Sequence, residues 1–309
     1  AIVDRLEIKG GLAVQIGGDE KLVAGELAAT GRFLVQILDP DPATVTGLRQ
    51  RLTQQNAYGP VSADLLPAGN GLPFTENLVN LVVLAPSAAE PLPATELFRV
   101  LCPRGVLIAA SGRVSEGALQ AVGFEVGGQP DGVEGWLVVR KPWPAEMDQW
   151  PEPRHGADGN AVSQDTVVGP PRRIRWVAGP SQEISSLVSA AGRNYYGGVW
   201  TRDAFNGLRL WQRDLKPSPA QGGFGFQRVP GSVRPIAAGE QLLVFADDAV
   251  TALNGATGEA IRQFPEAGKP TDVMVAGQTL LAVDAGSIRA VKMESGELRW
   301  TYQASEPRY

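Results

Sequence analysis

The distribution of apolar residues divides the chain into two halves with different periodicity. In residues 1–140, short apolar runs alternate with segments whose apolar residues recur at helical spacing. This alternation, with strands apolar throughout, predicts a parallel sheet covered by helices on both faces. From residue 184 onward, short runs rich in β-branched residues follow one another with tight glycine turns between them. That pattern predicts a second half built of β-strands.

The elements of the first half can be predicted by range. Strands are expected at 11–16, 33–38, 61–63, 78–84 and 105–110, and helices at 22–30, 43–56, 95–101 and 114–122. A closing antiparallel pair is expected at 124–126 and 135–140. Residues 1–140 are therefore predicted to form a Rossmann-like α/β domain. Residues 141–183, rich in proline, glycine and tryptophan, are predicted to form an ordered connection.

A sequence pattern recurs three times in the second half. Each copy is a short apolar strand, a polar turn ending in glycine, and a second strand; the turn glycines are Gly207, Gly258 and Gly296. Another strand pair precedes each copy. A four-strand unit that repeats about every 40–50 residues is typical of propeller blades. About three blades are predicted in residues 184–309, with an isolated strand at 174–176 that completes a blade.

Tryptophans close two of these repeats, at Trp211 and Trp300. Packing between blades is the expected role of both rings, and stacking on a quinone is the alternative. Closed propellers typically need about 4–8 blades, so three alone would leave apolar faces and strand edges exposed. We therefore expect either a truncated member of a longer family or completion by missing C-terminal blades or another subunit.

Composition and charge narrow the functional classes. The chain has 309 residues, 43% of them hydrophobic and 20% charged, which fits a globular protein of two domains. A net charge of −5 disfavours a nucleic-acid partner, and no run approaches the roughly 20 apolar residues of a membrane span. Cys102 is the single cysteine, which excludes an intrachain disulfide and a cysteine-based zinc site. The chain starts at Ala1, which indicates a processed form or an excised fragment.

A candidate nucleotide site follows the first three strands. Gly17-Gly18-Asp19 stands where a strand feeds a helix, a place whose unpaired amides favour anions and polar groups. Asp39 ends the second strand about 20 residues further on, where an acidic side chain binds a ribose diol in nucleotide-binding folds. Asp64 follows the third strand, within reach of a base.

These residues resemble the class I S-adenosylmethionine-dependent methyltransferase domain over about residues 8–140. The resemblance includes the turn Leu72-Pro73-Phe74 and the helix–turn–strand segment 96–107 (ELFRVLCPRGVL). It implies S-adenosylmethionine as a cofactor, held by Gly17, Gly18, Asp19, Asp39 and Asp64. The family's first loop carries Gly-x-Gly-x-Gly, whereas this chain has Gly17-Gly18-Asp19-Glu20-Lys21. A domain that keeps the fold without the cofactor therefore stays an alternative.

The junction carries a second resemblance. Segments 72–83 (LPFTENLVNLVV), 150–162 (WPEPRHGADGNAV) and 165–180 (DTVVGPPRRIRWVAGP) are similar to large bacterial proteins common in planctomycetes. In that family a methyltransferase-like domain precedes a propeller of pyrroloquinoline-quinone-type repeats. The resemblance implies an extracytoplasmic location, although a working methyltransferase would favour the cytoplasm. Glu152 and Pro153 replace a histidine and an aromatic residue of the family, and Gly156 replaces an aspartate.

His155 is the chain's single histidine and, with Asp158 and Asn160, forms a candidate junction site. Such a histidine can act as a general base or contact a ligand. It can also be a turn residue that caps the first blade through backbone hydrogen bonds. Both interpretations stay open from the sequence, and no metal site is predicted.

Three functions are compatible with these features. The favoured one is a binding or scaffold protein, with a degenerate methyltransferase-like domain and a propeller face that takes a protein or small-molecule ligand. The alternative is an S-adenosylmethionine-dependent methyltransferase whose propeller recruits the substrate. A quinoprotein oxidoreductase ranks third, because a lone cysteine and the lack of a calcium cluster disfavour pyrroloquinoline quinone.

Overall fold

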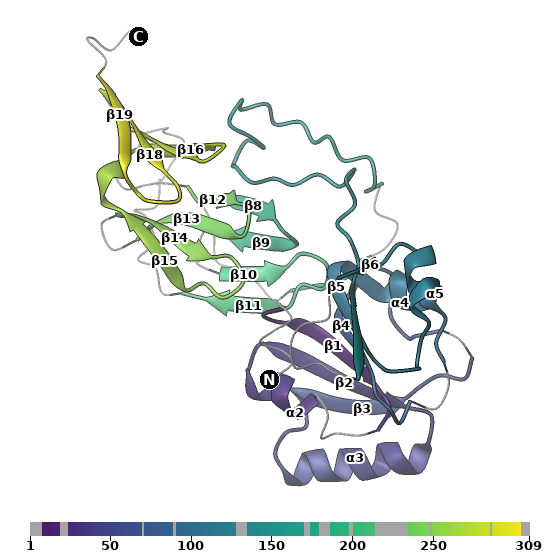
Figure 1. The fold of residues 1–309 in the computed structure, drawn as a ribbon. Helices are drawn as coiled ribbons and strands as arrows, with labels where there is room; N and C mark the ends of the chain where they lie inside the picture. Colours follow the sequence, from purple (N-terminus) through teal and green to yellow (C-terminus); the bar gives the residue numbers. More distant parts are fainter. Residues whose placement is uncertain are drawn as a thin grey trace. The chain divides into compact units, whose positions relative to one another are not determined.

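The computed structural model describes residues 8–18, 24–69, 71–88, 91–127, 135–169, 174–178, 186–197, 200–213, 234–246, 249–284 and 286–303. The chain forms two compact units (Figure 1). Unit 1 comprises residues 1–145, 171–176 and 205–208, and unit 2 comprises residues 146–170, 177–204 and 209–309. Within the described ranges, no helix is long and apolar enough to cross a membrane.

Unit 1 contains a sheet in the order β3-β2-β1-β4-β5-β7-β6. Its strands are β1 (Gly11–Ile16), β2 (Phe33–Asp39), β3 (Val61–Leu65), β4 (Val79–Leu84), β5 (Leu101–Ala110), β6 (Glu125–Val126) and β7 (Trp136–Arg140). Strands β1 to β5 pair in parallel, and β7 is antiparallel to both β5 and β6. The predicted Rossmann-like fold and the predicted closing pair are confirmed.

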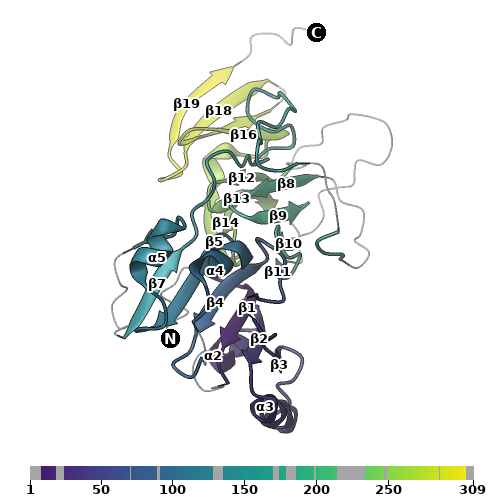
Figure 2. The same cartoon turned by 90° about the vertical axis from the view of Figure 1, so that its right-hand side faces the viewer.

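Helices cover both faces of this sheet because both faces are apolar. They are α2 (Ala24–Ala29), α3 (Pro42–Gln54), α4 (Ala94–Val100) and α5 (Glu116–Ala121). Leu27 and Leu48, from α2 and α3, pack on one face, and Leu97 and Leu119, from α4 and α5, pack on the other. Figure 2 shows α4 and α5 together and α3 beside β3. Alternate residues of each strand point to opposite faces, so the strands are apolar throughout.

Unit 2 contains, in its described residues, three four-stranded antiparallel sheets in which consecutive strands pair. The first sheet is β8 (Leu187–Ala190), β9 (Arg193–Tyr196), β10 (Trp200–Asp203) and β11 (Arg209–Gln212). The second is β12 (Ile236–Ala238), β13 (Gln241–Ala246), β14 (Ala249–Asn254) and β15 (Ala260–Phe264). The third is β16 (Asp272–Ala276), β17 (Thr279–Val283), β18 (Ser287–Lys292) and β19 (Leu298–Gln303). Strand β12 contacts both β8 and β16, so the first strands of the three sheets are neighbours (Figure 1).

The predicted isolated strand at 174–176 is wrong, because residues 174–178 form no strand. Side chains hold this segment within unit 1 instead of a strand ladder. Arg175 donates through Nη1 to the carbonyl oxygen of Glu76 at 2.9 Å. The ring of Trp176 lies over Gly207, where an added Cβ would stand 2.4 Å from ring atoms.

Trp211 joins the first sheet to the second. Its ring lies over Gly258, whose added Cβ would stand 2.7 Å from the ring, and its Nε1 donates to the carbonyl oxygen of Gly255 at 2.9 Å. Gly258 has φ +74°, a conformation that glycine adopts without strain. The side chain is 8% exposed, which confirms the predicted packing role. The same prediction stays untested for Trp300, which is 49% exposed because no described sheet follows the third one.

Truncating these two tryptophans should give different results. Trp211→Ala opens a buried interface between sheets and should lower the free energy of unfolding by about 3–5 kcal/mol. Trp300→Ala, the matched control, removes a half-exposed ring and should cost less than about 1 kcal/mol. Urea unfolding followed by circular dichroism measures both. Equal losses would contradict the assignment of Trp211 as an interface residue.

Lys141 is a buried cation of unit 1, with 7% exposure. Its Nζ donates to Asn77 Oδ1 at 2.6 Å and to the carbonyl oxygens of Phe98 and Leu101 at 2.7 and 2.8 Å. The last two carbonyls lie at the C-terminal end of α4, where a cation is favoured. Burial lowers the pKa of Lys141 to about 8, and the charge of Cys102 opposes this shift.

Lys141→Met should leave three acceptors without their donor and destabilise unit 1 by about 2–5 kcal/mol. Between pH 8 and about 10.5, the folded state binds fewer protons at Lys141 than the unfolded state. The wild-type free energy of unfolding should therefore rise with pH relative to the variant across that window. Urea titrations at pH 8 and pH 10 measure this, with the exposed Lys292→Met as control. A difference that is independent of pH would refute the lowered pKa.

Candidate functional site

The candidate site lies where the strand order of unit 1 reverses. Strands β2 and β4 flank β1 on opposite sides, and Ile16 pairs with both Leu38 and Leu84. Ligands of open α/β sheets bind outside the carboxyl ends of the strands at this switch point. Gly17 and Gly18 follow β1 directly at this edge. The topology therefore supports the place that the sequence predicts for a nucleotide.

Gly17 and Gly18 are enclosed by side chains of the same unit. Gly17 has φ +106°, and an added Cβ would stand 2.7 Å from Ser87 Oγ. An added Cβ on Gly18 would stand 2.3 Å from Thr44 Cγ2 and 2.8 Å from Asp39 Oδ2. Both positions therefore require glycine, whether or not a ligand is bound. The third predicted loop residue, Asp19, lies outside the described residues.

Asp39 ends β2 next to the Gly17-Gly18 turn. Its side chain is 7% exposed, and Oδ1 accepts from the backbone N of Asp41 at 2.9 Å. Asp41 caps α3 by accepting from the backbone N of Thr44 at 2.9 Å, and hydrogen bonds from Thr44 and Ala43 lower its pKa. The helix start thus positions the Asp39 carboxylate, with Oδ2 toward Gly18.

Asp64 lies in β3 rather than beyond it, because the strand extends to Leu65. Its Oδ2 accepts from Gln36 Nε2 at 3.0 Å, and its Oδ1 forms an ion pair with Arg49 Nη2. Arg49, which comes from α3, also donates through Nε to the carbonyl oxygen of Ala63 at 2.8 Å. Both carboxylate oxygens therefore have protein partners. The sequence analysis missed Arg49, whose position one helical turn after Val45 was the available signal.

These residues fit the nucleoside part of S-adenosylmethionine at one point and oppose it at another. Asp39 presents a buried carboxylate beside a glycine turn, the acceptor that a ribose diol requires. Asp64 already accepts from Arg49 and Gln36, so a base would have to share its oxygens with them. Asp39 is thus the residue at this edge that would suit a ribose hydroxyl.

The predicted junction site is organised in unit 2 by Asp148, a residue that sequence analysis missed. Its Oδ2 lies 2.8 Å from His155 Nε2 and accepts from Ser163 Oγ at 3.0 Å and from the backbone N of Gln164 at 2.8 Å. Hydrogen bonds lower the pKa of Asp148 to about 2. The bond from the backbone of Gln164 contributes most, and bonds from Gln149, His155 and Ser163 act in the same direction. No short motif marks this aspartate, so only its tertiary contacts identify it.

His155 is a turn residue with φ +76°, and its ring meets that of Trp150 edge-on at 5.1 Å. The structure pairs it with Asp148 rather than with the predicted Asp158. Asp158 instead accepts from the backbone N of Asn160 at 3.1 Å. Ser163 and His155 both bond to Asp148, so these three groups do not form a nucleophile–base relay.

Three successive residues near this junction contact the first strands of the three sheets. Trp150 exchanges backbone hydrogen bonds with Ser189 of β8 at 2.7 and 2.8 Å. The carbonyl oxygen of Pro151 accepts from Ala237 of β12 at 2.8 Å. Glu152 Oε1 accepts from the backbone N of Val275 in β16 at 3.3 Å. Burial raises the pKa of Glu152, with the charges of Asp272 and Asp158 acting in the same direction. Segment 150–152 thus connects the three sheets.

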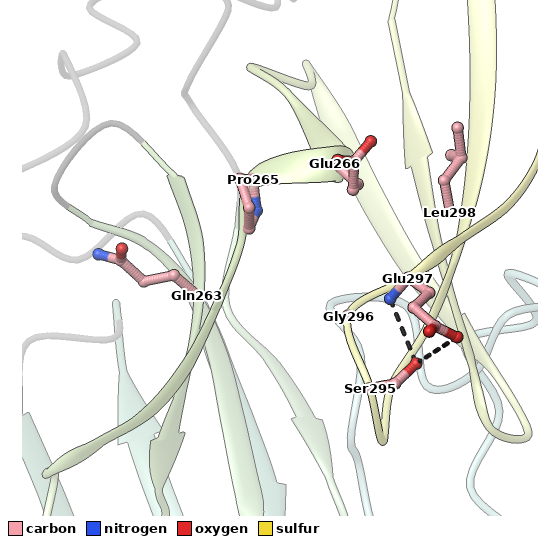
Figure 3. Close-up of a pocket in the computed structure, with 7 residues that line it drawn as sticks. All are labelled: Gln263, Pro265, Glu266, Ser295, Gly296, Glu297 and Leu298. Atoms are coloured by element: carbon pink, nitrogen blue, oxygen red, sulfur yellow. Dashed lines mark hydrogen bonds between the residues drawn. The ribbon is translucent and has the colours of Figure 1, made fainter.

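A notch of about 520 Å³ lies between the second and third sheets (Figure 3). It is lined by Gln263, Pro265, Glu266, Ser295, Gly296, Glu297 and Leu298. Glu297 accepts from Ser295 Oγ at 3.2 Å and forms an ion pair with Lys292 at 2.7 Å, which together lower its pKa. The Glu297 carboxylate in this notch is thus already engaged by Lys292 and Ser295. Among the described residues, no cluster of histidine, cysteine, aspartate and glutamate is suited to hold a metal.

Comparison with known proteins finds similarity in solved structures alone. No protein family model matches the chain, and no curated protein matches it. A methyltransferase from Aquifex aeolicus dependent on S-adenosylmethionine is 16% identical, with a TM-score of 0.37 over 45% of this chain and 86% of that one. A TehB-like methyltransferase from Corynebacterium glutamicum is 18% identical, with a TM-score of 0.34 over 46% and 85%. The cyclase SpnF is 14% identical, with a TM-score of 0.37 over 46% and 79%.

Removing the Asp148 carboxylate should loosen segment 146–165. Asp148→Asn loses an acceptor of charge-assisted bonds and should speed amide exchange at His155 and Gln164 by about tenfold. Hydrogen-exchange mass spectrometry measures this, with Asp158→Asn as the matched control. Because the folded pKa lies below the ordinary value, wild-type protection should persist above pH 4 and fall from pH 4 towards pH 2. Equal exchange in both variants would contradict the central role of Asp148.

Proposed function

We propose that unit 1 binds S-adenosylmethionine at the carboxyl edge of β1 and β2 and acts as a methyltransferase. The observation that carries this proposal is the Asp39 carboxylate, held against the Gly17-Gly18 turn at the point where the strand order reverses. Anchoring by the backbone N of Asp41 orients this carboxylate before any ligand arrives. The structural similarities to methyltransferases show only that the proposal is compatible with the fold.

In this proposal each residue has a distinct role. Asp39 accepts hydrogen bonds from the ribose hydroxyls, and Gly17 and Gly18 let the backbone approach the cofactor closely. Asp64 contacts the base after Arg49 releases one of its oxygens. The bound cofactor supplies a methyl group to a nucleophile of the substrate, and the protein contributes chiefly positioning.

We further propose that the three sheets of unit 2 are consecutive blades of a propeller that recruits the substrate, a protein or a small molecule. Supporting this proposal, each sheet has four consecutive strands, and the first strands β8, β12 and β16 are neighbours. Segment 150–152 crosses these three strands in the same order.

A binding protein without a cofactor is the second candidate. Two observations favour it: the ion pair of Arg49 with Asp64, and the close contact of Thr44 and Asp39 with Gly18. In that case the glycine turn serves packing alone. The recognition surface would then lie on the sheets of unit 2.

Calorimetric titration with S-adenosylmethionine and S-adenosylhomocysteine separates the two candidates. The methyltransferase proposal predicts micromolar binding that Asp39→Ala weakens at least tenfold, because the ribose loses its acceptor, a loss of about 1.4 kcal/mol or more. Asp41→Asn, which keeps the helix cap, is the matched control and should bind normally. Arg49→Ala should tighten binding by freeing Asp64.

Two outcomes would contradict the proposed cofactor site at the edge of β1 and β2. Absence of heat and of thermal stabilisation at millimolar cofactor would favour the second candidate. Binding that Asp39→Ala leaves unchanged would place the cofactor elsewhere. Transfer of a labelled methyl group to an extract component, lost in a folded Asp39→Ala variant, would establish catalysis.

A further inference from the structure

The outer face of the third sheet, turned away from the second sheet, is apolar and open. The strand registers place Met274, Leu281, Ile288, Trp300 and Tyr302 on this face, the first three partly exposed, and we call this set the third-sheet face. Trp300 is 49% and Tyr302 57% exposed. Strand β19, which carries both aromatic residues, is exposed at each of its six positions and forms the edge of its sheet (Figures 1 and 2).

The equivalent face of the second sheet is buried against another sheet. Strand registers align the two sheets: Phe264 pairs with Val250 as Tyr302 pairs with Ile288. Phe264 and Val250 are both 0% exposed, because they pack in one cluster with residues of the third sheet. The same pattern of positions is therefore buried when a sheet follows.

The first interface of the series shows the chemistry of the contact. A tryptophan of the fourth strand, Trp211, covers the turn glycine Gly258 of the next sheet and bonds to the carbonyl oxygen of Gly255. Trp300 stands at the equivalent position of the third sheet, since Trp211 pairs with Thr201 and Trp300 with Ala290. Trp300 thus matches a contact that this chain already makes elsewhere.

We propose that the third-sheet face docks a further four-stranded sheet of the same repeat, presented by a partner polypeptide. Trp300 stacks on the glycine of the turn between the partner's third and fourth strands, and its Nε1 donates to a carbonyl oxygen of that turn. Met274, Leu281, Ile288 and Tyr302 pack against the partner's first three strands. The inference is independent of the cofactor proposed for unit 1.

A second copy of this chain is a poor occupant, because its own equivalent turns are engaged. Trp176 covers Gly207, and Trp211 covers Gly258. The turn of Gly296 faces the second sheet, with Arg262 at 3.8 Å from an added Cβ. The partner sheet must therefore present a glycine turn that no ring covers.

A hairpin from this chain provides the probe. A backbone-cyclised peptide of residues 249–264 carries the Gly255–Gly258 turn that Trp211 binds. Fluorine NMR of the full chain labelled with 5-fluorotryptophan should show a saturable shift of the Trp300 resonance, which Trp300→Phe assigns. Trp300→Ala should weaken peptide binding at least tenfold. The matched control peptide, Gly258→Val, should not bind, because a β-branched residue is strained at φ +74°.

A second measurement keeps the proposal testable if the isolated hairpin does not fold. A tandem chain, with a second copy of residues 265–303 joined after Tyr302, should fold the added sheet onto β19. Trp300 should then become protected from acrylamide quenching, and Gly296→Val in the added copy should reverse this protection. An added sheet that leaves Trp300 accessible, or that fails to fold, would overturn the proposal. So would sedimentation showing a dimer that Trp300→Ala dissociates, because the occupant would then be a second copy.

Discussion

Both units depend on one constraint: a sheet that is apolar on both faces must be covered twice. In unit 1 the cover comes from helices, with α2 and α3 on one face and α4 and α5 on the other. In unit 2 it comes from neighbouring sheets, so the middle sheet packs through Leu242 on one side and Leu243 on the other. Inner strands of both units, such as β4 and β14, bury consecutive apolar residues, and the two units differ in their connections. The crossover connections of unit 1 form helices that cover its sheet. The turns of unit 2 are too short to form such helices, so each sheet is covered by packing against the next sheet.

This difference explains which parts of the fold the sequence predicts. The strands of unit 1 follow from apolar runs, and 11–16 is predicted at its observed bounds. The repeats of unit 2 follow from glycines that need positive φ, such as Gly258. The segment 174–176 misleads because its alternation of apolar and charged residues imitates a strand. The conformation of this segment depends on contacts distant in sequence: Arg175 bonds to Glu76, and Trp176 packs on Gly207. No local sequence pattern specifies these contacts.

The candidate site shows the same division. Gly17, Gly18 and Asp39 lie together at the switch point because strand order alone places them there. The state of Asp64 depends instead on Arg49, a side chain that reaches across from a helix. Likewise, His155 is conspicuous as the single histidine, but its partner Asp148 gains its importance from accepting three bonds at one oxygen. Sequence spacing identifies residues that lie together because they follow neighbouring strand ends. It misses residues that reach the site only through side-chain contacts between distant segments.

Interfaces between sheets are also not uniform, and the notch between the second and third sheets shows why. At the position where the first sheet carries Trp211, the second carries Arg262, whose Cδ would stand 3.8 Å from a Cβ added to Gly296. The space that an indole would fill there is left to polar groups such as Glu297 (Figure 3). The apolar contact of Phe264 with the third sheet must then provide more of the cohesion. Since the second sheet carries Arg262 at the position equivalent to Trp300, the strand pattern itself does not require a tryptophan there.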